Sequence, residues 1–222
     1  MKEIDFMSSL HKSTERDYLS RVNDKEYPKH KAASLAKKWD YEYWDGDRRI
    51  NYGGYKYINN RWIEVIKKLV KTYNLPENAK VLDIGCGKGF FLYDFLKYKP
   101  KSEVYGIDIS RYAINNAKEE VKNKIVCGNA TNLPWEDNFF DLVISITTLH
   151  NLYAQDLEKA LMEMERVGKN KYLCVESYRN EEEKANLLYW QVTCESFNTP
   201  AEWEWWFKTT KYTGDYSFIF FE

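Results

Sequence analysis

Short apolar runs alternate with longer amphipathic segments over residues 79–177 of the chain. Stretches of helical length, such as GFFLYDFLKYKP, SRYAINNAKEEV and DLEKALMEMERV, stand between the runs. This alternation is typical of right-handed strand–helix–strand units around a buried parallel sheet. It predicts an α/β fold, a Rossmann-like and mostly parallel sheet flanked by helices, with strands in five runs: AKVLDIG, EVYGIDI, KIVCG, FFDLVISI and KYLCVES.

The residues before this region predict a helical N-terminal cap. Two short charged helices are expected within residues 11–22 and 29–39. The aromatic stretch over 39–57 has neither helical nor strand period, so it predicts a long structured loop. We therefore expect a cap and lid over residues 1–58 and the main domain over residues 59–222.

Several elements of the main domain can also be predicted from local signals. Ser110 is a candidate N-cap, and Thr199 to Glu202 fits a capping box with proline at the first helical position. Cys194 is expected within a helix, and the final YSFIFFE predicts a strand at the sheet edge. A helix is predicted over 60–73, because four of its residues share one face: Trp62, Ile66, Leu69 and Tyr73.

Charge and cysteine content exclude several classes of protein. The 222 residues suit one sizeable core, and 33 basic against 34 acidic side chains create no strong field for nucleic acid or an anionic membrane. The four cysteines form no CxxC pair, which argues against structural zinc and suits a reducing compartment. Membrane-spanning and signal segments are not evident. We expect a cytoplasmic monomer or homodimer that uses no metal.

The stretch VLDIGCGKG places three glycines directly after a predicted strand. It is not a nucleoside-triphosphate loop, because Lys88 is followed by Gly89 rather than by Ser or Thr. It is not a dinucleotide fingerprint either, because Phe90 stands where the third glycine would be. Asp83 would repel a pyrophosphate but could hold a cation. The loop therefore favours a ligand without phosphate.

VLDIGCGKG resembles the first motif of class I S-adenosylmethionine-dependent methyltransferases. EVYGIDIS, GNATNLPW and FDLVISITTLHNL resemble the second, third and fourth strand motifs of that family, in the same order, so the resemblance covers residues 60–177. It implies a methyltransferase with S-adenosyl-L-methionine as its cofactor. The cap sequence looks like that of small-molecule methyltransferases from bacterial surface-glycan or secondary pathways.

The resemblance also implies which residues bind the cofactor. Asp108 would accept hydrogen bonds from both ribose hydroxyls. Asn129 stands where the family more often has Asp, and its carbonyl oxygen can still accept from the adenine amino group. Asp83 would favour the cationic ammonium, and the glycines would let the backbone pass where a Cβ would collide with the cofactor. The full set is Asp83, Gly85, Gly87, Gly89, Asp108, Ile109, Asn129, Ala130 and Ser145.

The fourth-strand motif carries His150 on the acceptor side of the site. A hydroxyl or ammonium acceptor must lose a proton during methyl transfer, and an imidazole can take it near neutral pH. His150 is therefore the candidate general base, although it could instead cap the next helix or pack under the lid. The Asn/Asp-Pro-Pro-aromatic element of base and glutamine N-methylation and the nucleophilic Cys of RNA cytosine C5 methylation are both missing from this position.

Aromatic and basic residues supply candidate substrate contacts. Gly53 and Gly54 would let the cap loop fold tightly. The candidates in the cap are Arg49, Tyr52, Tyr55 and Tyr57, of which the aromatic residues could equally fill the seam between the cap and the sheet. After the fifth strand the candidates are Tyr178 and Arg179, which could equally belong to a polar loop with a helix-capping acid cluster.

The acceptor class predicted first is a hydroxyl of a small polar metabolite, such as a sugar, a phosphorylated sugar or a phosphoramidate. The alternatives are N-methylation of a small amine or amino acid, and a non-catalytic protein that binds S-adenosylmethionine. Aminopropyl transfer is disfavoured, because the acid pair that it needs is replaced by TTLHNL.

Overall fold

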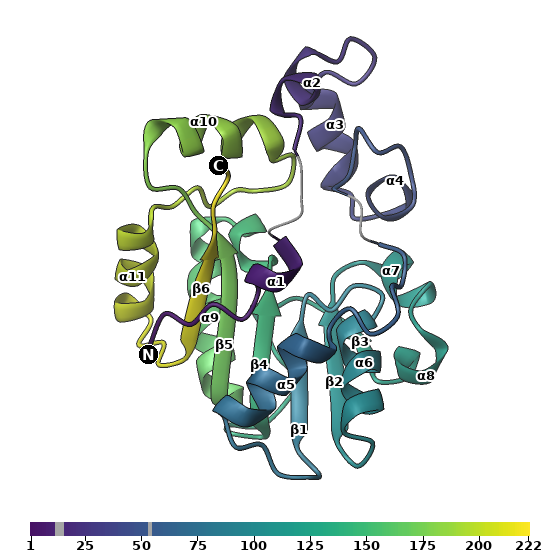
Figure 1. The fold of residues 1–222 in the computed structure, drawn as a ribbon, viewed down its shortest axis with the longest axis vertical. Coiled ribbons are helices and arrows are strands. Elements are labelled where there is room, and N and C mark those ends of the chain that lie inside the picture. Colours follow the sequence, from purple (N-terminus) through teal and green to yellow (C-terminus); the bar gives the residue numbers. More distant parts are fainter. Residues whose placement is uncertain (12–15, 53–54) are drawn as a thin grey trace.

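The computed structural model describes residues 1–11, 16–52 and 55–222 of the chain. In this part, six strands form one sheet in the order β3-β2-β1-β4-β5-β6 (Figure 1), and every neighbouring pair is parallel. The predicted Rossmann-like fold is confirmed, and the aromatic C-terminal strand lies at the edge as expected. The strands are β1 (Lys80–Ile84), β2 (Glu103–Asp108), β3 (Ile125–Cys127), β4 (Phe140–Ile146), β5 (Gly168–Glu176) and β6 (Asp215–Ile219).

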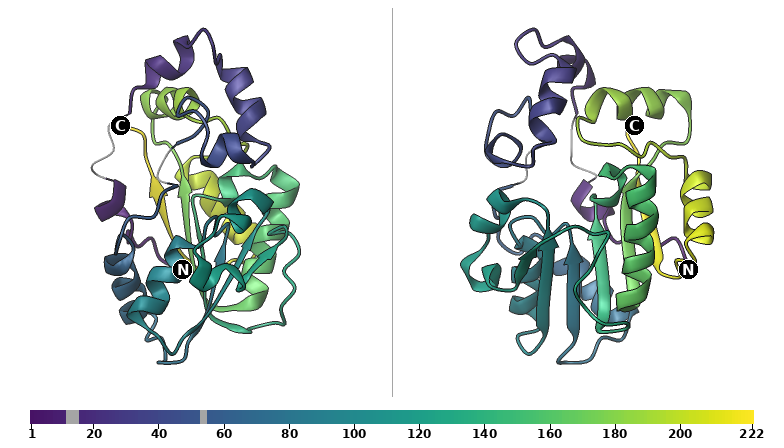
Figure 2. Two further views of the ribbon diagram at one scale, coloured as in Figure 1. Left: turned by 90° about the vertical axis from the view of Figure 1, so that its right-hand side faces the viewer. Right: turned by 180° about the vertical axis from the view of Figure 1, so that it is seen from behind.

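Alternate residues of the central strands pack on opposite faces of the sheet. In β4, Leu142 and Ile144 belong to one core cluster, whereas Val143 belongs to the other. This is the period of two that a strand with both faces buried requires. Figure 2 shows the helices on both sides of the sheet. The first face is covered by α5 (Ile63–Thr72) and α6 (Phe90–Tyr98), and the second by α9 (Ala154–Val167) and α11 (Pro200–Thr209).

The N-terminal cap lies beyond the carboxyl ends of the strands (Figure 1). Its helices are α2 (Tyr18–Asn23), α3 (Lys29–Ala36) and α4 (Tyr41–Trp44), and α10 (Glu181–Trp190) lies next to α2. The short helix α4 falls in the stretch that was predicted to be a loop. It forms there because the Asp40 side chain accepts a hydrogen bond from the Tyr41 amide and starts one helical turn.

Both predicted helix starts are confirmed. The Ser110 side chain accepts from the Ala113 amide. Thr199 and Glu202 form a capping box, with Pro200 in the first turn. These side chains satisfy amides that the helices cannot pair internally.

Two other local predictions were wrong. The segment 110–121 forms two short helices, α7 (Arg111–Asn115) and α8 (Glu119–Lys122), instead of one. The helix breaks because the Lys118 amide donates to the Lys88 carbonyl in the glycine loop. Cys194, expected in a helix, lies in an irregular segment between α10 and α11.

The first residues of the chain lie with the sheet and not with the cap. The Ile4 amide donates to the Tyr216 carbonyl at 2.8 Å, and the Tyr216 amide donates to the Lys2 carbonyl at 3.0 Å. The helix α1 (Ser8–His11) follows. The predictions for residues 12–15 and for Gly53 and Gly54 fall outside the described residues. Within the described ranges, no helix has both the length and the apolar character needed to span a bilayer.

Candidate active site

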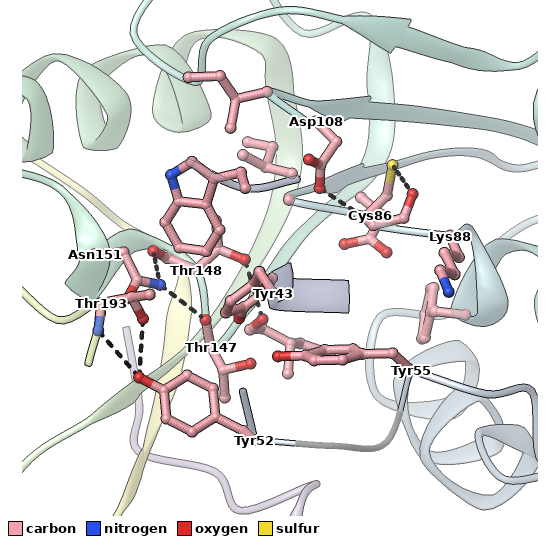
Figure 3. Close-up of a pocket in the computed structure, with 18 of the residues that line it drawn as sticks. Tyr43, Tyr52, Tyr55, Cys86, Lys88, Asp108, Thr147, Thr148, Asn151 and Thr193 are labelled. Carbon is pink, nitrogen blue, oxygen red and sulfur yellow. Dashed lines mark hydrogen bonds between the residues drawn. The ribbon is translucent and has the colours of Figure 1, made fainter. Parts of the chain in front are cut away.

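A cavity of about 530 Å³ lies between the carboxyl ends of the strands and the cap. Its walls come from the glycine loop, from the ends of β2, β4 and β5, and from the cap. Figure 3 shows Asp108 and Cys86 on one side of this cavity and Tyr52 and Thr193 on the other. The carboxyl edge of such a sheet is the usual place for a ligand, and the volume is within the range of about 300–1,000 Å³ for ligand sites.

The three glycines of the loop all have positive φ angles, +78° at Gly85, +53° at Gly87 and +71° at Gly89. A Cβ on Gly87 would lie 2.7 Å from Cη2 of Trp44, and one on Gly89 would lie 2.8 Å from Cγ2 of Val121. The sequence predicted a collision with the cofactor. The structure adds that a Cβ would first collide with the protein itself, so the glycines are required for packing as well.

Asp108 stands at the end of β2 with its carboxylate held by backbone amides. Its Oδ2 accepts from the Gly87 amide at 2.7 Å, and its Oδ1 accepts from the Ser110 amide at 2.8 Å. Each oxygen keeps a lone pair for a further donor, as the predicted ribose contact needs. Burial raises the pKa of Asp108, and the two amides oppose that shift.

The other predicted adenosine contacts lie nearby. Ile109, Asn129 and Ala130 line the cavity. The Asn129 Oδ1 already accepts from the Thr131 amide at 3.0 Å, so it would have to share that oxygen with an adenine amino group. Ser145 does not line the cavity, because it is buried in β4 and its hydroxyl donates to the Ile84 carbonyl at 3.0 Å.

Asp83 lines the cavity at the end of β1 and is only 6% exposed. Burial, and then the negative charge of Asp108, raise the pKa of Asp83 to about 8. Such a carboxyl is neutral at neutral pH and ionises when a cation lies against it. The donor set therefore fits the cationic S-adenosylmethionine, as do the glycine loop and Asp108.

His150 and Glu176 form a buried pair on the opposite wall. The Nε2 of His150 lies 3.5 Å from Oε2 of Glu176, and both residues line the cavity. Burial lowers the pKa of His150 to about 3 and raises the pKa of Glu176 to about 8. Among the described residues, the Nδ1 of His150 has no hydrogen-bond partner. A neutral imidazole with a free nitrogen can accept a proton from a bound ligand.

The predicted substrate contacts divide into two groups. Tyr52 and Tyr55 line the cavity. The other four residues do not, because their side chains face elsewhere or are engaged outside it. Their contacts are those of Arg49 with Asp47 and Glu26, of Tyr57 with Asp94, of Arg179 with Glu183 and Glu222, and of Tyr178 with Lys184.

Sequence reasoning missed the contact between the cap and the glycine loop. Lys88 places its Nζ 2.7 Å from Oδ1 of Asp45 and is 8% exposed. Trp44 lies against Gly87 and donates from Nε1 to the Ser110 hydroxyl at 2.8 Å. The dense aromatic composition of residues 39–62 was the available signal, but it did not show which residues face the loop.

The family of the chain follows from a comparison with known proteins. Residues 75–213 match the family model described as a methyltransferase domain. The chain therefore belongs to this family and contains a class I S-adenosylmethionine-dependent methyltransferase domain, as the sequence predicted.

Curated relatives match about half of the chain. A demethylmenaquinone methyltransferase of Anoxybacillus flavithermus is 35% identical over 120 residues, covering 50% of this chain and 50% of the relative. A tRNA (carboxymethyluridine(34)-5-O)-methyltransferase of Arabidopsis thaliana is 32% identical over 117 residues, covering 52% of this chain and 28% of the relative. The chain thus spans about half or less of the length of these relatives.

Solved structures agree with the fold. The YcgJ protein of Bacillus subtilis superposes with a TM-score of 0.52 at 22% identity, covering 65% of this chain and 66% of that one. At this identity the likeness shows the fold alone.

Proposed function

We propose that this protein transfers the methyl group of S-adenosylmethionine to a hydroxyl of a small polar metabolite, with His150 as the general base. The observation that carries the proposal is that one cavity joins the glycine loop and Asp108 to the His150–Glu176 pair. The cofactor would supply an electrophilic methyl on a sulfonium. The glycine loop, Asp83 and Asp108 would hold it.

The protein would contribute alignment and proton removal. Methyl transfer is an in-line displacement, so most of the advantage comes from holding the acceptor oxygen opposite the sulfur. As the oxygen–carbon bond forms and the carbon–sulfur bond breaks, the hydroxyl proton would pass to His150. Glu176, 3.5 Å away, would in its ionised form stabilise the imidazolium.

Unpaired cations at the cavity favour an acceptor that also carries an anionic group. Arg16, Lys56 and Arg61 all line it. Within the described residues, none of the three forms an ion pair with a carboxylate, whereas Lys88, which also lines the cavity, is paired with Asp45. Unpaired positive charge at a cavity attracts anions. A phosphorylated sugar or a phosphoramidate would satisfy this requirement.

Methylation of a small amine is the second candidate, and the aromatic walls favour it. Tyr43, Trp44, Tyr52 and Tyr55 surround the cavity, and Glu176 adds a carboxylate. Rings with an acid are a suitable environment for an ammonium group.

The experiment that separates these candidates identifies the methylated atom. S-adenosylmethionine with an isotope-labelled methyl would be incubated with the protein and two matched panels, anionic hydroxyl compounds and small amines. Mass spectrometry of the products should find the label on oxygen. Label on nitrogen would support the second candidate, and binding without transfer to either panel would favour a non-catalytic protein.

A further inference from the structure

A directed chain of hydrogen bonds connects the cap to the His150–Glu176 pair. The Tyr52 hydroxyl accepts from the amides of Val192 at 2.6 Å and Thr193 at 3.0 Å. It donates to Oε1 of Gln191 at 2.6 Å. The Nε2 of Gln191 in turn donates to Oε2 of Glu176, the oxygen that faces His150. The contact of Tyr52 with Thr193 can be followed in Figure 3.

The hydrogen-bond donors determine the orientation of the Gln191 amide. A tyrosine hydroxyl has one proton to donate, and the Tyr52 oxygen already receives two backbone amides. The proton therefore points away from these amides, to Oε1 of Gln191 at 2.6 Å or to Oγ1 of Thr193 at 3.1 Å, and the shorter contact favours Gln191. Because the carbonyl of Gln191 faces Tyr52, its NH₂ group must face Glu176.

Burial makes this donor important. Gln191 is 3% exposed and Glu176 is 9% exposed, so water is a poor substitute for the amide. Burial raises the pKa of Glu176 and is the largest effect. The charge of Arg16 and the hydrogen bond from Gln191 both lower this pKa, because they favour the ionised carboxylate. The ionisable groups that interact with Glu176 are His150, Arg16, Tyr43, Tyr52, Cys174 and Cys194.

We propose that Gln191 is a positioning residue that holds the Glu176 carboxylate against His150, and that Tyr52 makes this arrangement depend on the docked cap. The inference rests on the proposed function, in which His150 accepts the proton of the acceptor. The chain of hydrogen bonds is complete only when the Tyr52 segment lies on the residues after α10. The base is thus oriented only when the cap covers the cavity.

The test follows the imidazole resonances by NMR as the pH changes. The chain has three histidines, so the signals can be assigned by substitution. In the wild type, the His150 resonance should report the ionisation of Glu176. Gln191→Met removes the hydrogen-bond donor and leaves the ionised Glu176 carboxylate less stabilised. The midpoint of this titration should therefore rise by about one pH unit. Tyr52→Phe should move it in the same direction by less.

The matched control removes a side-chain amide from α10, the helix that ends just before Gln191. Asn186 lies in α10, and its Nδ2 donates to the Phe221 carbonyl at 3.0 Å, away from the cavity. Asn186→Leu should leave the titration of His150 unchanged. An unchanged titration in Gln191→Met, or an equal shift in Asn186→Leu, would overturn the proposal. If Gln191→Met does not fold, an unchanged titration in Tyr52→Phe would overturn it.

This readout needs no acceptor and no turnover, so it is separate from the proposed function. Lack of methyl transfer by the wild-type protein would rule out the proposed function, and with it a role of Gln191 in catalysis. The link between Gln191 and the ionisation of Glu176 would still be decided by NMR. Once an acceptor is known, Gln191→Met should lower kcat while the KM for S-adenosylmethionine stays the same.

Discussion

At the scale of single residues, burial in the cavity keeps several ionisable groups in their neutral forms. Burial raises the pKa of Asp83 and of Glu176 to about 8 and lowers that of His150 to about 3. Each group can become charged when a ligand brings the opposite charge or a proton. Asp83 would respond to the cofactor and the other two to the acceptor.

The affinity for S-adenosylmethionine should therefore depend on pH through Asp83. A raised pKa means that the protonated carboxyl stabilises the fold at low pH, and that this contribution is lost as the pH rises through about 8. A bound cation favours the ionised form, so binding should release a proton. Affinity should increase from about pH 6 to about pH 8, by at most about tenfold per unit. Calorimetry in buffers of different ionisation enthalpy measures both effects.

Asp141 provides the control for this prediction. It lies at the start of β4, at the opposite end of the sheet, where its Oδ2 accepts from the Lys80 amide. Asp83→Asn should abolish the pH dependence between pH 6 and 8, and Asp141→Asn should retain it. The assignment fails if Asp83→Asn keeps the full slope.

His150 carries the proposed proton transfer. His150→Gln should reduce kcat by about 10²- to 10⁴-fold, the usual contribution of a general base, with cofactor affinity close to that of the wild type. His30→Gln, at an exposed position in α3, is the control and should leave kcat unchanged. Steady-state rates together with binding titrations measure both quantities. Wild-type turnover by His150→Gln would leave His150 a packing role only.

At the scale of elements, the short helix α4 packs against the glycine loop. Trp44 contacts Gly87, and Asp45, which follows the helix, pairs with Lys88. Tyr112 also donates to Asp45, at 2.8 Å. A ligand on the glycine loop would thus lie beneath α4, as expected of a lid that excludes water.

Trp44→Ala should release this contact. The variant loses the packing against Gly87 and the hydrogen bond to Ser110, so S-adenosylmethionine should dissociate faster, by about tenfold or more. Stopped-flow fluorescence measures the dissociation rate. Trp205→Ala, in α11 and 57% exposed, is the matched control. Equal rates in Trp44→Ala and the wild type would show that α4 does not retain the cofactor.

At the scale of the whole molecule, the sheet could be predicted from the sequence because its signals are local. Alternating apolar runs, the glycine loop and the capping residues each depend on neighbours a few positions apart. The cap could not be predicted in the same way. Contacts such as Lys88 with Asp45 and Tyr52 with Gln191 join distant segments, and no periodicity in the stretch over 39–57 indicates which side chains meet.

In the candidate site too, the positions that depend on local signals could be predicted, and those that depend on contacts between distant segments could not. Asp83 and Asp108 end their strands, so the parallel sheet brings them to one edge. Ser145 also belongs to a strand, but its hydroxyl is used by Ile84. Arg179 follows β5 and yet pairs with Glu183 outside the cavity. Glu176, at the end of β5, instead pairs with His150 and accepts a hydrogen bond from Gln191.

The most direct test of the account follows the labelled methyl group of S-adenosylmethionine in a cell extract. The wild-type protein should transfer the label to small molecules. Asp108→Asn, which weakens the charge-assisted hydrogen bonds expected with the ribose, should transfer much less at the same cofactor concentration. Label that stays on S-adenosylmethionine, or that appears only in protein or RNA, would contradict the account.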